Sequence, residues 1–339
     1  MIKKKTRTII TFIILIAMLL FAIGLNIGKG SVELNLKDIK DVIIGNKEFT
    51  KLEHNVLFKI RLPRILSAIL FGGALSISGY LLQTFFKNPI VGPFVLGISS
   101  GARLFVGFFI LTTVSIPFLN SSSLGMFLVS FAGSMLAMIL VLIFARSAES
   151  VSTLIVIGIM VGYIASAGTN FMITFASENN IANLQNWSLG SFSGVTWDML
   201  KVSSWIIIPA TILVFFLSKP LEGYLLGENY AKSMGINIKA FRVVLVILST
   251  VLSACVTAFA GPISFVGIAL PQLTRLSTKT SNPRILTPAI FLLGASFTLL
   301  ADYFARTLFA PTELNISTVT SFIGAPLVIW LMSNRGRRA

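Results

Sequence analysis

The sequence predicts an all-α, polytopic membrane protein with about ten transmembrane helices. Of its 339 residues, 55% are hydrophobic and only 12% are charged, whereas soluble domains contain about 25% charged residues. The mean hydropathy is +0.89. Apolar runs of about 20 residues, enough to cross a bilayer as a helix, recur along most of the chain. A soluble globular protein is therefore excluded.

The first span is expected at residues 9–27, after a basic start. A signal peptide begins similarly, but this run is long and lacks a clear small-residue cleavage site, so we expect a retained anchor. Residues 264–275 form a short run that contains Pro271, and residues 176–197 form an irregular segment that suits a membrane interface. The remaining spans are expected at 64–84, 93–116, 124–144, 151–175, 198–218, 240–260, 284–304 and 314–333.

The charge distribution predicts the orientation of the spans. The net charge is +15, from 27 basic and 12 acidic residues. With the N-terminus in the cytoplasm, the cytoplasmic segments contain 16 basic and three acidic residues, and the outer segments contain ten and nine. The remaining basic residue, Arg103, lies well inside the expected span 93–116 and is counted on neither side. Because cytoplasmic loops are enriched in Lys and Arg, we expect both termini in the cytoplasm and no role in binding nucleic acid.

This orientation divides the polar segments between the two sides of the membrane. Residues 28–60 are expected to form an extracytoplasmic loop or a short amphipathic helix, and residues 219–239 a cytoplasmic segment. The whole chain, 1–339, is expected to be one transmembrane domain.

The residues able to perform redox or acid–base chemistry are few. A single cysteine, Cys255, excludes an intramolecular disulfide and a multi-cysteine metal site, and we expect it to be buried. A single histidine, His54, leaves little scope for proton relays. The chain lacks a Gly-x-x-x-x-Gly-Lys-Ser/Thr phosphate loop, so it is not expected to bind ATP in that way. We expect no catalytic residue, no metal ligand and no bound cofactor.

Small residues recur at the spacing that lets membrane helices approach closely. Ala68, Gly72 and Ser76 are each four residues apart, as are Gly158 and Gly162. We expect these residues to pack helices within the chain, and a subunit interface is the alternative.

A series of motifs extends over about residues 57–331. In chain order the motifs are Arg61-Leu-Pro-Arg64, Gly72–Gly79 with Gln83, Lys87–Ala102, Trp187–Ser191 with Trp197, Leu226–Gly235, Gly261–Pro271 with Arg275, Ala301–Arg306 and Gly324-Ala-Pro326. This ordered series closely resembles the permease subunits of ABC importers for ferric siderophores, haem and cobalamin. Two positions depart from the family pattern. Pro271-Gln272 replaces the usual Pro-His, and Glu313-Leu-Asn-Ile-Ser317 replaces Glu-x-Pro-x-Gly.

The resemblance implies a protein of the bacterial cytoplasmic membrane and a set of partners. A second permease subunit, identical or paralogous, would complete the substrate path, and two ATPase subunits would bind ATP and Mg in the cytoplasm. An extracytoplasmic protein would deliver the substrate. A ferric siderophore is the expected substrate, with haem or cobalamin as alternatives. The alternative from a different class of transport protein is an ion-coupled carrier that works without an ATPase or a binding protein.

The cytoplasmic motif supplies the expected contacts with the ATPase. Taken alone, its residues also fit an amphipathic turn whose apolar face lies among lipid headgroups. In the resembling family the corresponding segment is a pair of short helices that rests in a groove of the ATPase. The expected coupling residues are Leu226, Gly227, Glu228, Ala231, Met234 and Gly235.

Three arginines are the expected docking points for the binding protein. Arg61, Arg64 and Arg306 match motif positions that receive acidic side chains in the resembling family. Arginines at a membrane boundary are also common interfacial anchors, and one of the three could pair internally with Asp302 or Glu313.

A last group of residues is expected to line the translocation path or to pack helices. The residues alone leave both roles open, because small residues permit a break in a helix as well as the close approach of a neighbouring helix. The group consists of Gly97, Ser99, Ser100, Gly101 and Arg103.

Overall fold

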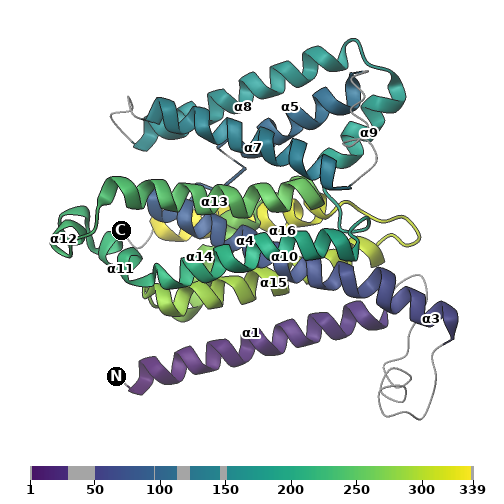
Figure 1. Cartoon of the computed structure of the whole chain (residues 1–339). Helices are drawn as coiled ribbons and strands as arrows, with labels where there is room; N and C mark the ends of the chain where they lie inside the picture. Colours follow the sequence, from purple (N-terminus) through teal and green to yellow (C-terminus); the bar gives the residue numbers. More distant parts are fainter. Residues whose placement is uncertain (1, 30–49, 95, 113–122, 146–150, 337–339) are drawn as a thin grey trace.

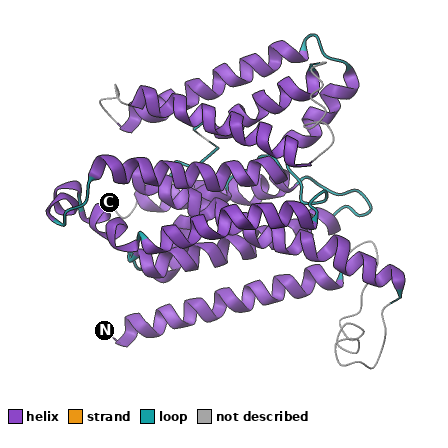
Figure 2. Cartoon of the chain, viewed as in Figure 1, coloured by secondary structure: helices purple, strands orange, loops and turns teal. Residues whose placement is uncertain are grey.

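The computed structural model describes residues 2–29, 50–94, 96–112, 123–145 and 151–336, and the regular structure within these ranges is helical (Figure 2). Its elements are α1 (Ile2–Gly28), α3 (Lys51–Asn55), the π-helical turn η1 (Val56–Arg61), α4 (Leu62–Phe85), α5 (Ile98–Leu111), α7 (Ser123–Ala145), α8 (Val151–Ile173), α9 (Glu178–Ser188), α10 (Trp197–Phe216), α11 (Ser218–Leu226), α12 (Glu228–Ser233), α13 (Ile238–Ala260), α14 (Val266–Thr278), α15 (Pro283–Thr307) and α16 (Ile316–Gly336).

The predicted membrane spans correspond to these helices. Within the described residues, eight helices are long and apolar enough to cross a membrane. The helices α5 and α14, of 14 and 13 residues, are shorter and occupy the other two predicted spans. The all-α polytopic fold is therefore confirmed.

Two boundaries differ from the prediction for local reasons. The predicted span 93–116 contains helix only from Ile98, because Gly97 before it has a φ of 74° and precludes helical continuation. Residues 178–188 of the expected irregular segment form the helix α9. Its first residue, Glu178, is an acid at a helix N-terminus, where negative charge is favoured.

The polar segment before the second span is partly helical. Thr50 and Glu53 form a capping box that starts α3, and the helix continues without a break through η1 into α4. Helical structure therefore begins at Lys51, earlier than the predicted residue 64. The other part of the predicted 28–60 loop, residues 30–49, lies outside the described residues.

The helices pack in three groups (Figure 1). In the centre, α4 contacts α13, α14 and α15. The helices α5, α7, α8 and α9 form a layer on one side, and α1 lies on the opposite side against α15. In α4 the apolar window is 89% buried, whereas in α1 it is 11% buried. The helix α4 is thus the core of the bundle, and α1 lies at its edge.

The two ends of the bundle differ in their contents (Figure 1). The chain termini lie at the end that also holds α11 and α12, and α3 lies at the opposite end. The termini therefore share one side, as the even number of predicted spans requires.

Glycines permit the closest helix contacts. A Cβ atom added to Gly72 would collide with Thr298 and Gly294 of α15, and one added to Gly79 would collide with the backbone of Gly267 in α14. A Cβ on Gly97 would lie only 3.1 Å from the carbonyl oxygen of Gly158 in α8. The small-residue spacings in α4 and α8 therefore serve packing within the chain, as expected.

Candidate functional site

The predicted coupling segment consists of two short helices, α11 and α12, joined at Gly227. Gly227 has φ 134° and ψ 151°, and Gly235 after α12 has φ 78°. Glycine adopts such positive φ values without steric cost, so both turns depend on its missing side chain. The segment folds back at both glycines and lies at the end of the bundle where the termini lie (Figure 1).

This segment has one buried and one exposed apolar side. Leu221, Tyr224 and Ala231 are buried and anchor the two helices to the bundle. Leu226 is 67% exposed, and Tyr230 and Met234 are also exposed. We call these last three residues the α11–α12 patch. Clustered apolar side chains at an aqueous surface are typical of protein or membrane contacts.

Glu228 fixes α12 to two other helices. Its carboxylate accepts hydrogen bonds from Lys87 at 3.1 Å, just after α4, and from Arg242 of α13 at 2.5 Å. Partial burial opposes ionisation of Glu228, but the hydrogen bonds and charges of Lys87 and Arg242 outweigh it and lower its pKa. The carboxylate is therefore ionised at neutral pH. The stability it adds is present above its ordinary pKa and is lost only as the pH falls through the lowered value.

The three predicted docking arginines lie at the opposite end of the bundle and are buried. Arg64 donates to both carboxylate oxygens of Asp302, with Nη2 2.9 Å from Oδ1, and Nη1 lies 3.1 Å from Oε2 of Glu313. Asp302 is 1% exposed on its side chain, whereas Glu313 is 46% exposed. The internal pairing that the sequence left as an alternative is thus present at Arg64.

The other two arginines join the same network to α1. Nε of Arg306 lies 3.4 Å from Oδ2 of Asp302, and its guanidinium also donates to the Asn26 side chain. Arg61 donates to the backbone oxygens of Ile27 and Gly28 at the end of α1. We call this set, with Arg64 and Glu313, the outer network. It connects α1, α4, α15 and the segment before α16.

The predicted path-or-packing group lies mostly at helix contacts. A Cβ on Gly101 would meet the Gly133 carbonyl oxygen of α7 at 2.5 Å, and Gly97 lies against α8. Ser99 and Ser100 are partly buried. Nη2 of Arg103 donates to Oε1 of Gln185 in α9 at 3.3 Å. These contacts favour packing for the glycines and show that Arg103 bonds α5 to α9.

Two polar contacts inside the bundle were not predicted. Gln83 of α4 donates to the backbone oxygens of Gly267 and Ile268, at 3.3 and 3.0 Å, and accepts a hydrogen bond from Gln272. Ser317 donates to the oxygen of Pro262 at 3.0 Å and accepts from the backbone N–H of Ser264. Both departures from the family pattern thus make hydrogen bonds: Gln272 joins α14 to α4, and Ser317 joins α16 to the segment between α13 and α14. The signal in the sequence that could have indicated these contacts is the presence of polar residues within apolar runs.

A cavity with a hydroxyl-rich wall lies beside α16. Its volume is about 640 Å³, and Ser188, Ser264, Ser317 and Ser321 lie on its wall together with apolar side chains that include Phe322. The cavity can offer hydrogen-bond donors and acceptors to a solute.

The comparisons with known proteins decide the family. A family model for the FecCD transport family matches residues 15–334. The chain belongs to this family. Vitamin B12 import system permease proteins, called BtuC, from Shigella sonnei strain Ss046 and Escherichia coli strain K12 / DH10B are each 36% identical to it over 292 residues, or 85% of this chain and 87% of theirs.

Solved structures agree with this membership. An inward-facing structure assigned to a metal-chelate type ABC transporter is 29% identical and covers 96% of this chain and 99% of its own, with a TM-score of 0.83. PsaBC from Streptococcus pneumoniae, in complex with Fab, shares the fold at a TM-score of 0.56 and 16% identity, covering 86% and 95%.

Membership of the FecCD transport family defines the coarse function. The chain is a permease subunit of an ABC importer in the cytoplasmic membrane, and it is not an enzyme. ATP hydrolysis takes place on a separate ATPase subunit, and importers of this family use a substrate-binding protein.

The outer network predicts a large effect of Asp302→Asn. The change leaves Arg64 and Arg306 buried without their shared carboxylate, and breaking a buried ion pair costs about 3–5 kcal/mol of unfolding free energy. Unfolding of the purified chain in detergent would measure the loss. In the control Asp198→Asn, the lost partner is Lys201 at 3.4 Å and the side chain is 92% exposed, so stability should hardly change. Equal losses in both variants would contradict a stabilising network.

Proposed function

We propose that this FecCD permease moves a large metal chelate, a ferric siderophore or cobalamin, into the cytoplasm. The similarity to the metal-chelate type transporter along nearly the whole chain supports this substrate class. The sequence favours a siderophore, whereas the vitamin B12 permeases among its relatives favour cobalamin as the second candidate. The hydroxyl-rich wall of the cavity beside α16 suits a solute with many hydrogen-bonding groups.

We propose that the whole chain acts as one transmembrane domain with its 219–239 segment in the cytoplasm and its 28–60 segment outside. Two permease subunits would form the path and two ATPases would drive it, with ATP and Mg on the ATPases. This permease would bind no cofactor of its own.

We propose that the α11–α12 patch binds the ATPase. Leu226, Tyr230 and Met234 are exposed at the end of the bundle assigned to the cytoplasm by charge. The ion pairs of Glu228 with Lys87 and Arg242 hold α12 against α4 and α13. A force applied to the patch would therefore reach two helices of the core directly. An amphipathic turn that only lay on lipid would not need these ion pairs.

We propose that the binding protein docks over the outer network. Its arginines are buried, so they would act through the positive field of the cluster and through exchange of partners. Glu313 is the carboxylate of this set that reaches solvent, and it forms an ion pair with Arg64. An acidic side chain of the binding protein could replace it there. Such contacts affect association rate and register more than affinity.

The variant Met234→Glu tests coupling to the ATPase. A charge in the patch would have to be buried on assembly, so co-purification with the ATPase should fall on the order of tenfold or more. The control Ser281→Glu places the same charge at an exposed position between α14 and α15. Unchanged assembly and transport in Met234→Glu would rule out the patch as the ATPase contact.

The variant Glu313→Gln tests docking. Removal of this carboxylate makes the outer network more positive, so the binding protein should associate faster, with a stronger dependence on salt. Glu178→Gln removes an exposed acid of α9 and is the control. Stopped-flow association at two ionic strengths measures both. An identical rate and salt slope for Glu313→Gln and the wild type would refute docking over the network.

Substrate identity is tested with the complete importer in liposomes. We expect ATP-dependent uptake of a ferric siderophore, and no uptake without the ATPase or the binding protein. Radiolabelled ferric chelates, cobalamin and haem would be compared at equal concentration. Uptake of cobalamin alone would assign the second candidate, and uptake driven by an ion gradient without ATPase would overturn the importer mechanism.

A further inference from the structure

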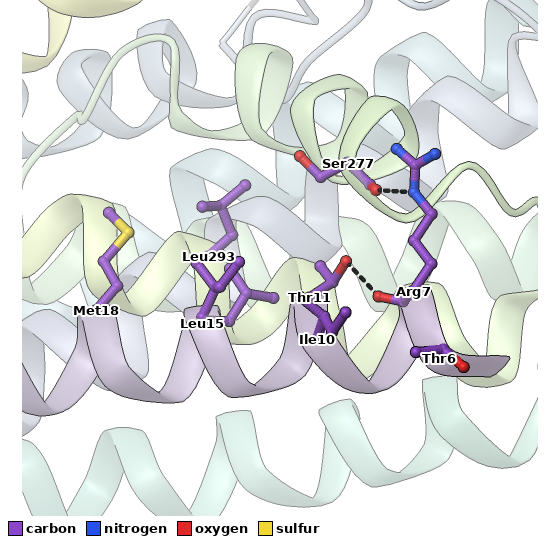
Figure 3. Close-up of a pocket in the computed structure, with 9 residues that line it drawn as sticks. Thr6, Arg7, Ile10, Thr11, Leu15, Met18, Ser277 and Leu293 are labelled. Carbon is purple, nitrogen blue, oxygen red and sulfur yellow. Dashed lines mark hydrogen bonds between the residues drawn. The ribbon is translucent and has the colours of Figure 1, made fainter. Parts of the chain in front are cut away.

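A groove of about 600 Å³ lies between α1 and the helices α14 and α15 (Figure 3). Its walls differ along its length. Ile10, Ile14 and Met18 of α1 and Leu293 of α15 form an apolar stretch, and Arg7 lies at one end. The groove is therefore amphipathic along the axis of α1.

The Arg7 side chain is held in place with part of its donors unused. Its Nε donates to the backbone oxygen of Ser277 at 3.1 Å, in the last turn of α14, where carbonyls lack helical partners. Figure 3 shows the guanidinium beside this turn, with both terminal nitrogens directed away from α1. Among the residues that the structure describes, no carboxylate forms an ion pair with Arg7. Two N–H-bearing nitrogens are thus positioned for an anion.

The position of the groove in the bilayer indicates what the anion belongs to. Arg7 lies at the start of the first span, at the end of the bundle that the charge distribution places in the cytoplasm. The apolar stretch continues from there into the span, and Ile14 is 58% exposed. The helix α1 lies at the edge of the bundle, and only 11% of its apolar window is buried within the chain, so this apolar stretch is open to lipid once the helix spans a bilayer. Lys279, which caps α14 two residues after Ser277, is exposed and adds positive charge.

We propose that this groove is a binding site for one anionic phospholipid of the inner leaflet. The phosphate would accept hydrogen bonds from the terminal nitrogens of Arg7, and an acyl chain would lie against Ile10, Ile14, Met18 and Leu293. Basic pockets between transmembrane helices on the cytoplasmic side are suited to anionic headgroups. An uncharged lipid or an apolar protein segment would fill the stretch but leave Arg7 without a counter-ion. The lipid would fill the space between α1 and the bundle at its inner end.

The test is competition between two lipids on the full-length chain. Phosphatidylglycerol and phosphatidylcholine with identical dioleoyl chains are offered in equal amounts, and native mass spectrometry counts the molecules retained. We expect the wild type to retain one phosphatidylglycerol in preference to phosphatidylcholine. Arg7→Gln should lower this preference about fivefold, as expected for loss of one basic residue at the membrane surface. The control Arg284→Gln removes an exposed charge at the start of α15, outside the groove, and should keep the preference.

Two further variants and a competitor separate the possible outcomes. Met18→Trp fills the apolar stretch and should reduce retention of both lipids, and Arg7→Lys should restore part of the preference. Thermal unfolding of each variant shows whether it is folded. Equal retention of both lipids by the wild type, or an equal preference in Arg7→Gln and Arg284→Gln, would overturn the proposal. Displacement of phosphatidylglycerol by millimolar inorganic phosphate would indicate a simple anion site and would also overturn it.

Discussion

The close approach of α4 to α14 and α15 is the constraint on which the rest of the bundle depends. Apolar side chains gain little by leaving a lipid environment, so membrane helices associate through packing and hydrogen bonds. Gly72 and Gly79 bring the α4 backbone against its neighbours, and a single Cβ at either position would collide with them. Ser78 of α4 and Ser249 of α13 exchange hydrogen bonds on another side. The core is thus set by the smallest side chains in the helix.

Because α4 is the central helix, each of its two ends contributes to one of the two candidate sites. Arg61 and Arg64 at its start belong to the outer network, and Lys87, two residues after its end, pairs with Glu228 of the coupling segment. The two ends differ in electrostatics. At the outer end the side chains of Arg64, Asp302 and Arg306 are buried and Glu313 reaches solvent, whereas Lys87 and Glu228 are both partly exposed. A well-packed helix links the side proposed for substrate delivery to the side proposed for ATP-driven motion.

Eight of the membrane spans could be predicted from the sequence because each is a local apolar run of sufficient length, whereas α5 and α14 are shorter than such a run requires. The two turns of the coupling segment were also local, since Gly227 and Gly235 are adjacent to the helices they end. The helix α9 could not be predicted by this criterion, since its residues are polar and its helical structure depends on its place beside α5. The sequence left internal pairing of one arginine with Asp302 or Glu313 open but could not decide which arginine pairs. Asp302 and Glu313 are 238 and 249 residues from Arg64, and no local pattern settles contacts at such separations.

The amide pair of Gln83 and Gln272 has a consequence for how this contact responds to acidification. It joins α4 to α14 inside the bundle, and neither side chain gains or loses a proton at physiological pH. The resembling permeases usually have histidine at the position of Gln272, and the pKa of an unperturbed histidine is about 6.5. In this chain the hydrogen bond between the two helices would therefore keep the same strength in acidic and neutral surroundings. The replacement makes this helix contact independent of proton concentration.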